Sequence, residues 1–415
     1  MKLEQWQTNL YTLWITQIFS MVGFGLGLPF IPYYIQDMGV ANEIQLNFLT
    51  GLSSTLPAIS LAIFLPIWGK LSDVYGRKMM QIRAMAGATV ILMLYSVTHA
   101  IIPFMILRFL HGVFCGTVSS ALTFVSANTP ENKMSYAIGF LTSSNFLGYA
   151  IGPVLGGFLA EIVGYQNCFF IGGCIMLVGC IFVAILLKED PNSYGRALIE
   201  KQQQSASFDK EQDGKKKRKE RIITSFIISV LIILLFVRMT RSIFSPFVPL
   251  FVLERLGADA TGATMYTGFI NAATGVGTAL ASVTLARLGD KYNKCYLCMI
   301  FSIIAFCASL LLIPEYPLYL FCIVFAFYFF ICGAIEPIIT SWASENTDSS
   351  HRGMLFGIMG TVNSVAMIIA PMIGSSISAT FMPSAILYSI PLFTAIQTLL
   401  LFISKKRIAK NCIKM

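Results

Sequence analysis

The sequence predicts an all-α membrane protein with twelve transmembrane helices in two pseudo-symmetric six-helix bundles. Of the 415 residues, 56% are hydrophobic and only 12% are charged, whereas soluble domains carry about 25% charged residues. Several apolar stretches reach about 20 residues, the length at which an α-helix crosses the hydrocarbon layer. Short motifs of the first half also recur in the second half at a nearly constant spacing.

The hydropathy pattern places the twelve spans in chain order. Only helices fit these stretches, because a backbone in lipid must satisfy its own hydrogen bonds and the runs are far longer than a barrel strand. Charged turns separate most neighbouring spans. The expected spans lie near residues 10–35, 46–68, 79–98, 101–125, 134–160, 166–187, 222–253, 262–286, 295–313, 317–343, 353–379 and 383–404.

The positive charges predict the orientation. Of the 29 Lys and Arg residues, 25 fall in termini and loops on one side of these spans, and the opposite loops hold Arg255 alone. Cytoplasmic loops carry the excess of Lys and Arg, so both termini are expected in the cytoplasm of a bacterial cytoplasmic (inner) membrane. The formal net charge of +9 is therefore a signal of topology, and no nucleic-acid partner is expected.

The chain divides into three segments. Residues 1–187 form an N-terminal bundle, residues 222–415 form a C-terminal bundle, and the polar segment 188–221 is expected to be a solvated cytoplasmic linker. The basic block at 215–219 is suited to anionic lipid headgroups at the membrane surface.

The two bundles are expected to be repeats of one another. Five landmarks match at an offset of 217 or 218 residues: 28–32 with 245–249, Asp73 with Asp290, Gly116 with Gly333, Gly139 with Gly357, and 152–153 with 370–371. Parallel repeats about an axis along the membrane normal place a binding site at the midplane between them.

Three motifs resemble those of the major facilitator superfamily. Residues 69–78 are similar to its loop between helices two and three, 108–112 to its Arg-x-x-x-Gly element of helix four, and 148–157 to its antiporter motif of helix five. The segments 6–10 and 27–32 resemble drug:proton antiporters of the MdtG type. This resemblance implies two bundles that rock about a central site and export drugs against a flow of protons.

The first motif is expected to act as a conformational latch. Gly69 and Gly76 permit a tight turn, and Asp73 can pair with Arg77 or with a helix N-terminus. The resemblance assigns this cluster, with Asp290 in the second repeat, to locking the outward-facing state. The alternative is a charge cluster that only sets topology, which does not require paired glycines.

The helix-five motif predicts close helix packing. Gly148, Gly152 and Gly156 advance by four residues and share one face of a helix, which lets a neighbouring helix approach as in other small-residue contacts. Pro153 adds a kink, and Gly157 extends the motif. The resemblance adds that this surface moves during export, whereas the alternative is static packing.

Arg108 and His111 are candidates for a proton pathway. Charged side chains inside membrane spans are costly and usually face the interior of the bundle, and residues three apart share a helix face. Arg108 could keep His111 neutral or make it titrate within the pathway. The family motif usually has Gln in place of His111, and a structural histidine is the alternative.

A second polar stripe lies on the seventh span. Arg238, Arg241 and Ser245 share one helix face, and Glu336 on the tenth span is the acid placed well inside an apolar stretch. Counting from the helix ends puts Arg238 about 24 Å and Glu336 about 13 Å deep, so a simple pair is not favoured. We expect both arginines to attract an anionic group and Glu336 to exchange a proton, because burial favours the protonated carboxylate.

One departure from the drug:proton antiporters concerns helix one. Many of them carry an acid there, whereas residues 10–35 hold none, so the coupling site cannot simply be transferred. An adaptable apolar pocket could draw on six aromatic residues: Phe24, Phe30, Tyr33, Phe244, Phe247 and Trp342.

The expected function is proton-coupled export of amphipathic small molecules. The alternative is a dedicated transporter for an anionic metabolite such as a polycarboxylate siderophore, because in-span arginines outnumber acids. No enzyme activity is expected, since the sequence offers no catalytic cluster. No metal or other cofactor is expected, and Cys295 and Cys298 lack a second ligand pair. The partners are a small-molecule substrate, protons and the lipid bilayer, and the chain is expected to be monomeric.

Overall fold

The computed structural model describes residues 4–130, 133–189, 225–257, 262–347 and 352–412. Within these ranges the chain is helical and contains no β-strand. Most of the linker predicted at 188–221, including the basic block, lies outside the described residues.

The N-terminal half comprises α1 Gln5–Gly27, η1 Leu28–Phe30, α2 Ile31–Asp37, α3 Glu43–Tyr75, α4 Arg77–Ser96, α5 Ile101–Phe114, α6 Thr117–Asn128 and α7 Met134–Leu186. The C-terminal half comprises α9 Ser225–Phe244, η3 Ser245–Phe247, α10 Val248–Leu256, α11 Ala263–Val283, η4 Ala286–Asp290, α12 Lys294–Leu310, α13 Leu318–Cys332, α14 Ile335–Glu345, α15 Arg352–Thr380, η6 Pro383–Tyr388 and α16 Ser389–Cys412.

The helices account for the predicted membrane spans. Ten helical segments of the described chain are long and apolar enough to cross a membrane. One of them, within α7, comprises two helices that meet at Gly164, whose positive φ of 78° marks the turn between the fifth and sixth spans. The shorter apolar helix α12 supplies the remaining span.

Side-chain caps fix two of the helix starts. The Asn42 side chain accepts a hydrogen bond from the backbone N–H of Gln45 at the start of α3, and Asn293 does the same for Cys295 at the start of α12. Such caps satisfy N–H groups that have no partner inside the helix.

The first, fourth and seventh spans, which face the centre, are interrupted. The first and seventh spans change to 3-10 helix at η1 and η3, where Pro29 and Pro246 stand at the helix start. The fourth span breaks between α5 and α6 at Gly116, whose φ is 130°, whereas the tenth passes from α13 to α14 through Gly333 and Ala334, which keep right-handed helical backbone angles. Both spans lie where hydropathy placed them, and hydropathy gave no signal for the break at Gly116.

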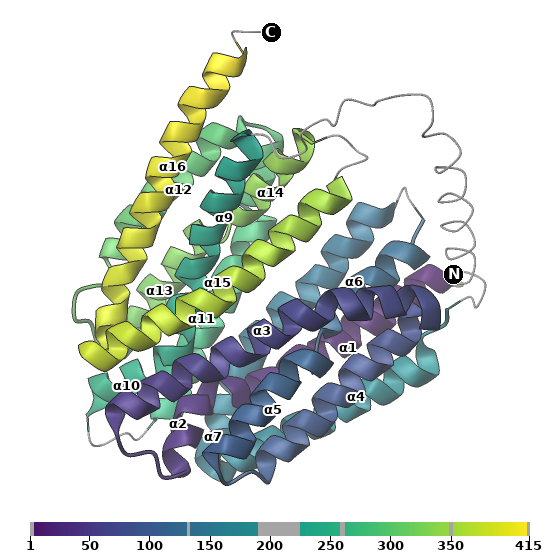
Figure 1. Ribbon diagram of the computed structural model, residues 1–415, viewed down its shortest axis with the longest axis vertical. Coiled ribbons are helices and arrows are strands. Elements are labelled where there is room, and N and C mark those ends of the chain that lie inside the picture. Colours follow the sequence, from purple (N-terminus) through teal and green to yellow (C-terminus); the bar gives the residue numbers. More distant parts are fainter. Residues whose placement is uncertain (1–3, 131–132, 190–224, 258–261, 348–351, 413–415) are drawn as a thin grey trace, which may run out of the picture.

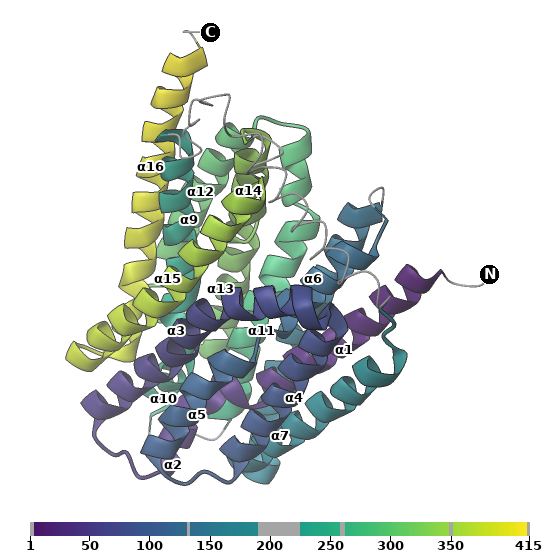
Figure 2. The same ribbon diagram turned by 45° about the vertical axis from the view of Figure 1, so that its right-hand side comes forward.

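The two halves meet at one end and diverge at the other. Figures 1 and 2 show both chain ends at the end opposite α2 and α10, where the halves are apart. Helices α3 and α15 lie side by side (Figure 1), and the Thr55 hydroxyl on α3 donates to the carbonyl oxygen of Ile368 on α15 (3.1 Å). At the closed end the Ser378 hydroxyl donates to Asn47 Oδ1 (2.5 Å).

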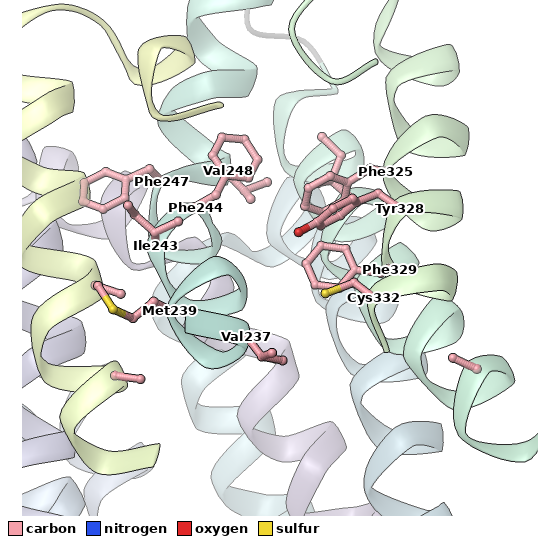
Figure 3. Close-up of a cluster of buried hydrophobic side chains, with 14 of the residues drawn as sticks. Val237, Met239, Ile243, Phe244, Phe247, Val248, Phe325, Tyr328, Phe329 and Cys332 are labelled. Carbon is pink, nitrogen blue, oxygen red and sulfur yellow. The ribbon is translucent and has the colours of Figure 1, made fainter. Parts of the chain in front are cut away.

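Each half has its own apolar packing. In the C-terminal half, Phe244 on α9 packs edge-on against Phe325 on α13 with ring centroids 5.7 Å apart, and Phe325 packs against Phe329. Figure 3 shows this cluster of buried side chains between α9 and α13. These contacts hold the arginine-bearing helix α9 against its neighbours.

Candidate functional site: the central cavity

A cavity of about 670 Å³ lies between the two halves. The interrupted segments form much of its wall, because Leu28, Pro29, Gly116, Ser245 and Pro246 all line it. Apolar side chains dominate the remaining wall, including Met21, Phe24, Leu61, Phe146 and Met367. Two guanidinium groups reach the wall, from Arg108 of one half and Arg241 of the other, and none of the residues found lining the cavity in the described chain is an Asp or Glu.

Arg238, Arg241 and Glu336 form a charged triad beside this cavity. Glu336 Oε1 accepts hydrogen bonds from Arg238 Nε (3.1 Å) and Nη2 (2.8 Å). Its Oε2 accepts from Arg241 Nη1 (2.9 Å). The side chains of Arg238, Glu336 and Arg241 are 14%, 25% and 28% exposed, respectively. With the carboxylate ionised, the triad carries a net charge of +1.

The interruptions of the helices favour this arrangement. Glu336 lies in the first turn of α14, where the helix dipole stabilises a negative charge, and Arg241 lies in the last turn of α9, where the dipole stabilises a positive charge. The two guanidiniums are anchored further, because Arg238 Nη1 donates to the Met359 carbonyl oxygen (2.6 Å) and Arg241 Nη2 donates to Thr278 Oγ1 (2.8 Å).

The depth argument from the sequence was wrong about the pair. It placed Arg238 and Glu336 at levels too different for direct contact, but the structure brings both arginines onto the one carboxylate. The count of helix rise assumed that the seventh and tenth spans end at the same height in the membrane. It also ignored the reach of an arginine side chain, which spans several residues of helix rise.

Arg108 and His111 lie together on the opposite wall of the cavity. Arg108 is 5% exposed and His111 is 8% exposed. Arg108 Nε donates to the Ser53 carbonyl oxygen (2.6 Å), while Arg108 Nη1 is buried without a hydrogen-bond partner among the described residues. His111 Nδ1 lies 3.2 Å from the Tyr95 hydroxyl. Tyr95 is a contact that the sequence analysis missed, because it lies on another span with no motif around it.

The helix-five glycines pack as the sequence predicts. A Cβ atom added at Gly152 would lie 2.9 Å from the Cα of Gly25 on α1, and one added at Gly156 would lie 2.6 Å from the carbonyl oxygen of Leu26. Gly157 faces the other half, since a Cβ there would lie 2.7 Å from the carbonyl oxygen of Thr264 on α11. Helix α7 is therefore held closely between α1 and α11, and its movement during transport stays a prediction.

The predicted latch is described only in part. Gly76 has a positive φ of 92° and joins α3 to α4, as expected for a tight turn. Gly69 lies inside α3, and a Cβ atom added there would meet nothing within 4 Å, so no close contact requires glycine at this position. The side chains of Asp73 and Asp290 lie outside the described part of the structure, so the latch stays a prediction.

Two residues assigned to the linker are bound to the N-terminal half. The Glu189 carboxylate accepts hydrogen bonds from the backbone N–H groups of Arg77 (3.0 Å) and Lys78 (2.8 Å). Lys188 exchanges two backbone hydrogen bonds with the Asn9 side chain (2.7 and 3.0 Å). The composition of the linker gave no signal for these contacts, because both residues are polar like those that follow.

The predicted aromatic pocket is mostly not present. Of the six aromatic residues, only Phe24 lines the cavity. Phe30, Phe244 and Phe247 are buried in the core, and Trp342 packs against Phe226. An aromatic residue in an apolar span is selected by packing as often as by a ligand, so sequence alone could not separate the two.

Tyr33 closes the end of the cavity opposite the chain ends. Its side chain is 4% exposed. The hydroxyl donates to the Pro249 carbonyl oxygen (2.9 Å) and lies 2.9 Å from Thr267 Oγ1. Both partners belong to the other half, so these hydrogen bonds form only while this end is closed.

We expect Tyr33→Phe to shift the protein toward opening at this end. Losing one buried hydrogen bond costs about 1 kcal/mol, which corresponds to about a fivefold change in an equilibrium constant. The distance between spin labels on α2 and α10 would report the shift. Tyr34→Phe is the matched control, because the Tyr34 hydroxyl donates to the Tyr95 carbonyl oxygen (2.7 Å) within the same half. Equal distance distributions for the two variants would contradict this role of Tyr33.

The fold and cavity together define a multi-pass membrane transporter with one central site between two repeats. The family model described as Major Facilitator Superfamily matches residues 13–237 and 230–411. The chain belongs to this superfamily.

Relatives and solved structures agree with this membership. The chain is 29% identical over 409 residues to a multi-drug resistance efflux pump PmrA homolog of Lactococcus lactis, covering 98% of this chain and 97% of that one. It is 27% identical to the multidrug resistance protein MdtG of Klebsiella pneumoniae, covering 91% and 88%. A bacterial homologue of the human lysosomal transporter Spinster, in an inward-facing and occupied conformation, shares the fold with a TM-score of 0.76 at 13% identity, covering 98% of each chain.

Proposed function

We propose that this protein exports amphipathic small molecules from the bacterial cytoplasm by alternating access, driven by protons. It would act as a monomer in the cytoplasmic membrane with both termini in the cytoplasm. The full-length similarity to proteins named as multidrug efflux pumps supports the substrate range. The excess of Lys and Arg on the side of the termini supports the orientation.

The observation that carries the proposal is the shape of the central site. The cavity is mostly apolar and is complete within one chain. It is closed on the side of Tyr33 by contacts between the halves, and the halves diverge on the side of the chain ends (Figure 2). Under the proposed orientation this is an inward-facing state, ready to take a substrate from the cytoplasm or the inner leaflet.

The triad is the proposed site of proton coupling. In the structure the Glu336 carboxylate oxygens lie 2.8 Å from a guanidinium nitrogen of Arg238 and 2.9 Å from one of Arg241. Protonation of Glu336 would remove the negative charge that these two arginines share. Such a change would weaken the contact between α9 and α14, and α9 lines the cavity through Arg241 and Ser242. A proton could thereby alter the shape of the wall that meets the substrate.

The alternative of a polycarboxylate siderophore has less support. A ligand with several carboxylates needs several cationic partners once it is desolvated, whereas the wall offers only Arg108 and Arg241, of which Arg241 is already paired. We therefore propose no second function.

Transport by the purified chain in proteoliposomes tests the proposal. Vesicles with an acidic interior and the cytoplasmic face outward should accumulate an uncharged amphipathic dye, and a protonophore should stop the accumulation. Empty vesicles serve as the control. Accumulation that is insensitive to the protonophore would refute proton coupling, and a lack of any accumulation across a panel of cationic, neutral and anionic dyes would refute the export function.

A further inference from the structure

The break between α5 and α6 leaves carbonyl groups without helical partners beside the cavity. Helix α5 ends at Phe114, and Cys115 after it has an extended backbone. Gly116 then adopts a φ of 130°, which favours glycine over any other residue. The carbonyl groups in the last turn of a helix have no partner within it, and leaving them unpaired inside a membrane protein is costly. This junction of Cys115 and Gly116 therefore needs hydrogen-bond donors from other helices.

Two side chains from neighbouring helices supply such donors. Trp68 Nε1, on α3, donates to the Val113 carbonyl oxygen (2.7 Å). Arg83 Nη1, on α4, donates to the Phe114 carbonyl oxygen (3.1 Å). The helix dipole also favours the positive charge of Arg83 at the end of α5. Trp68 and Arg83 thus provide the hydrogen bonds that a continuous helix would have formed with its own N–H groups.

The two capping side chains also contact one another. The guanidinium carbon of Arg83 lies 3.8 Å from the ring centroid of Trp68, which is a cation–π contact. Helix α4 packs closely at the same point, because a Cβ atom added at Gly87, one turn after Arg83, would lie 2.7 Å from the Cβ atom of Phe114. Contacts from two helices therefore converge on the last turn of α5. We call Trp68 and Arg83 the α5 clamp.

The clamp lies outside the cavity but holds part of its wall. Residues 115–119 line the cavity, whereas neither Trp68 nor Arg83 is among the lining residues found in the described chain. Trp68 directly precedes the segment 69–78, and Arg83 follows that segment by five residues. The clamp therefore connects the turn at Gly76, between α3 and α4, to the wall that meets the substrate.

We propose that Trp68 and Arg83 are positioning residues for substrate binding. They hold the junction of α5 and α6 in the geometry that the cavity offers to a substrate, so a bound molecule does not have to order this part of the wall. Pre-organisation of this kind raises affinity, because the cost of ordering is already met in the free protein. This inference rests on the proposed export function, since it takes the central cavity as the substrate site.

Trp68→Phe tests the clamp by removing one hydrogen-bond donor. Phenylalanine keeps a ring on which Arg83 can stack but cannot donate to the Val113 carbonyl. We expect the affinity for N-phenyl-1-naphthylamine, an uncharged amphipathic dye, to fall about fivefold, the factor for one lost hydrogen bond. Dye fluorescence with the full chain in phosphatidylcholine nanodiscs measures the affinity, and empty nanodiscs give the background. An unchanged affinity would overturn the proposal.

Cys115 reports on the junction itself. Cys115 and Cys168 are both buried in the N-terminal half, but of the two only Cys115 lines the cavity. In Trp68→Phe we expect N-ethylmaleimide to modify Cys115 about fivefold faster, because the junction opens more often, while the rate at Cys168 stays the same. Mass spectrometry of the peptides measures both rates. Equal increases at the two cysteines would indicate general loosening of the bundle, and no increase at Cys115 would mean that the clamp does not hold the junction. Either result would refute the proposal.

The matched control is Trp14→Phe. The Trp14 indole N–H donates to Ser143 Oγ (3.0 Å) in the same half, and Trp14 is not among the residues found lining the cavity in the described chain. This variant therefore loses the same kind of hydrogen bond away from the junction. If it lowers the dye affinity as much as Trp68→Phe does, the effect is not specific to the clamp and the proposal is refuted.

A second pair of variants tests Arg83. Arg83→Lys keeps a positive charge and a donor, so it should retain more of the dye affinity than Arg83→Met, and equal losses in the two would refute the role of Arg83. The cysteine measurement needs no substrate, which separates the clamp from the export function. A wild type that neither binds the dye nor shows protonophore-sensitive transport refutes the export function and the link to substrate binding, while the Cys115 rates still decide whether the clamp fixes the junction.

Discussion

We expect Glu336→Gln to abolish proton-driven transport and to lower the stability of the C-terminal half. The variant keeps the volume of the side chain but removes the charge that Arg238 and Arg241 share. Breaking a buried ion pair on one side costs about 3–5 kcal/mol, and the partial exposure of the triad favours the lower value. Transport under a proton gradient and thermal unfolding in detergent would measure the two effects.

A compensating double variant separates charge balance from proton exchange. Glu336→Gln combined with Arg241→Gln restores the net charge of +1 and leaves one guanidinium anchored at Met359. We expect this double variant to recover much of the stability but none of the proton-driven transport. Wild-type transport rates in Glu336→Gln under a proton gradient would show that the carboxylate takes no part in coupling.

We expect Gly25→Ala to disrupt the packing of α1 on α7. The added Cβ atom would lie 2.7 Å from the Cα of Gly152, and this neighbour is backbone that cannot rotate away. Overpacking of this kind costs about 1–3 kcal/mol, and the rigid neighbour places the expected value at the upper end. The yield of folded protein and its melting temperature would show the effect.

The control for this substitution is Gly139→Ala. Gly139 lies on α7, the same helix as Gly152, but a Cβ there would meet nothing within 4 Å. This variant should be as stable as the wild type or slightly more stable, because alanine has the higher helix propensity. Equal melting temperatures for Gly25→Ala and Gly139→Ala would show that α1 can move away from α7 at little cost.

The fold could be predicted because hydropathy and positive charge report directly on a membrane. Spans of about 20 apolar residues are helices in lipid, and the repeated segments around Pro29 and Pro246 both fold as 3-10 turns, although the repeat itself did not predict that conformation. The same signals are insensitive to a break inside a span. The residues around Gly116, where the fourth span breaks, are apolar or small on both sides, so hydropathy continues through the break.

The site could be predicted only as a set of residue types. Rare charges inside apolar spans correctly identified Arg108, Arg241 and Glu336 as belonging to the interior of the bundles, because such residues are costly in lipid. Which charges touch one another depends on the relative height and rotation of the helices, and one sequence contains no information on either. This is why the count of helix rise separated Arg238 from Glu336, although the two are in contact.

The interruptions of the first, fourth and seventh spans bear on how a substrate becomes occluded. Each of these three spans is divided into two shorter helical segments, with junctions at η1, Gly116 and η3 that line the cavity. Helical segments that bend at these junctions can close the cavity around a bound molecule before the two bundles rotate relative to each other. Substrates of different size can then be enclosed by different degrees of helix bending, so the same fold can accommodate substrates of many shapes.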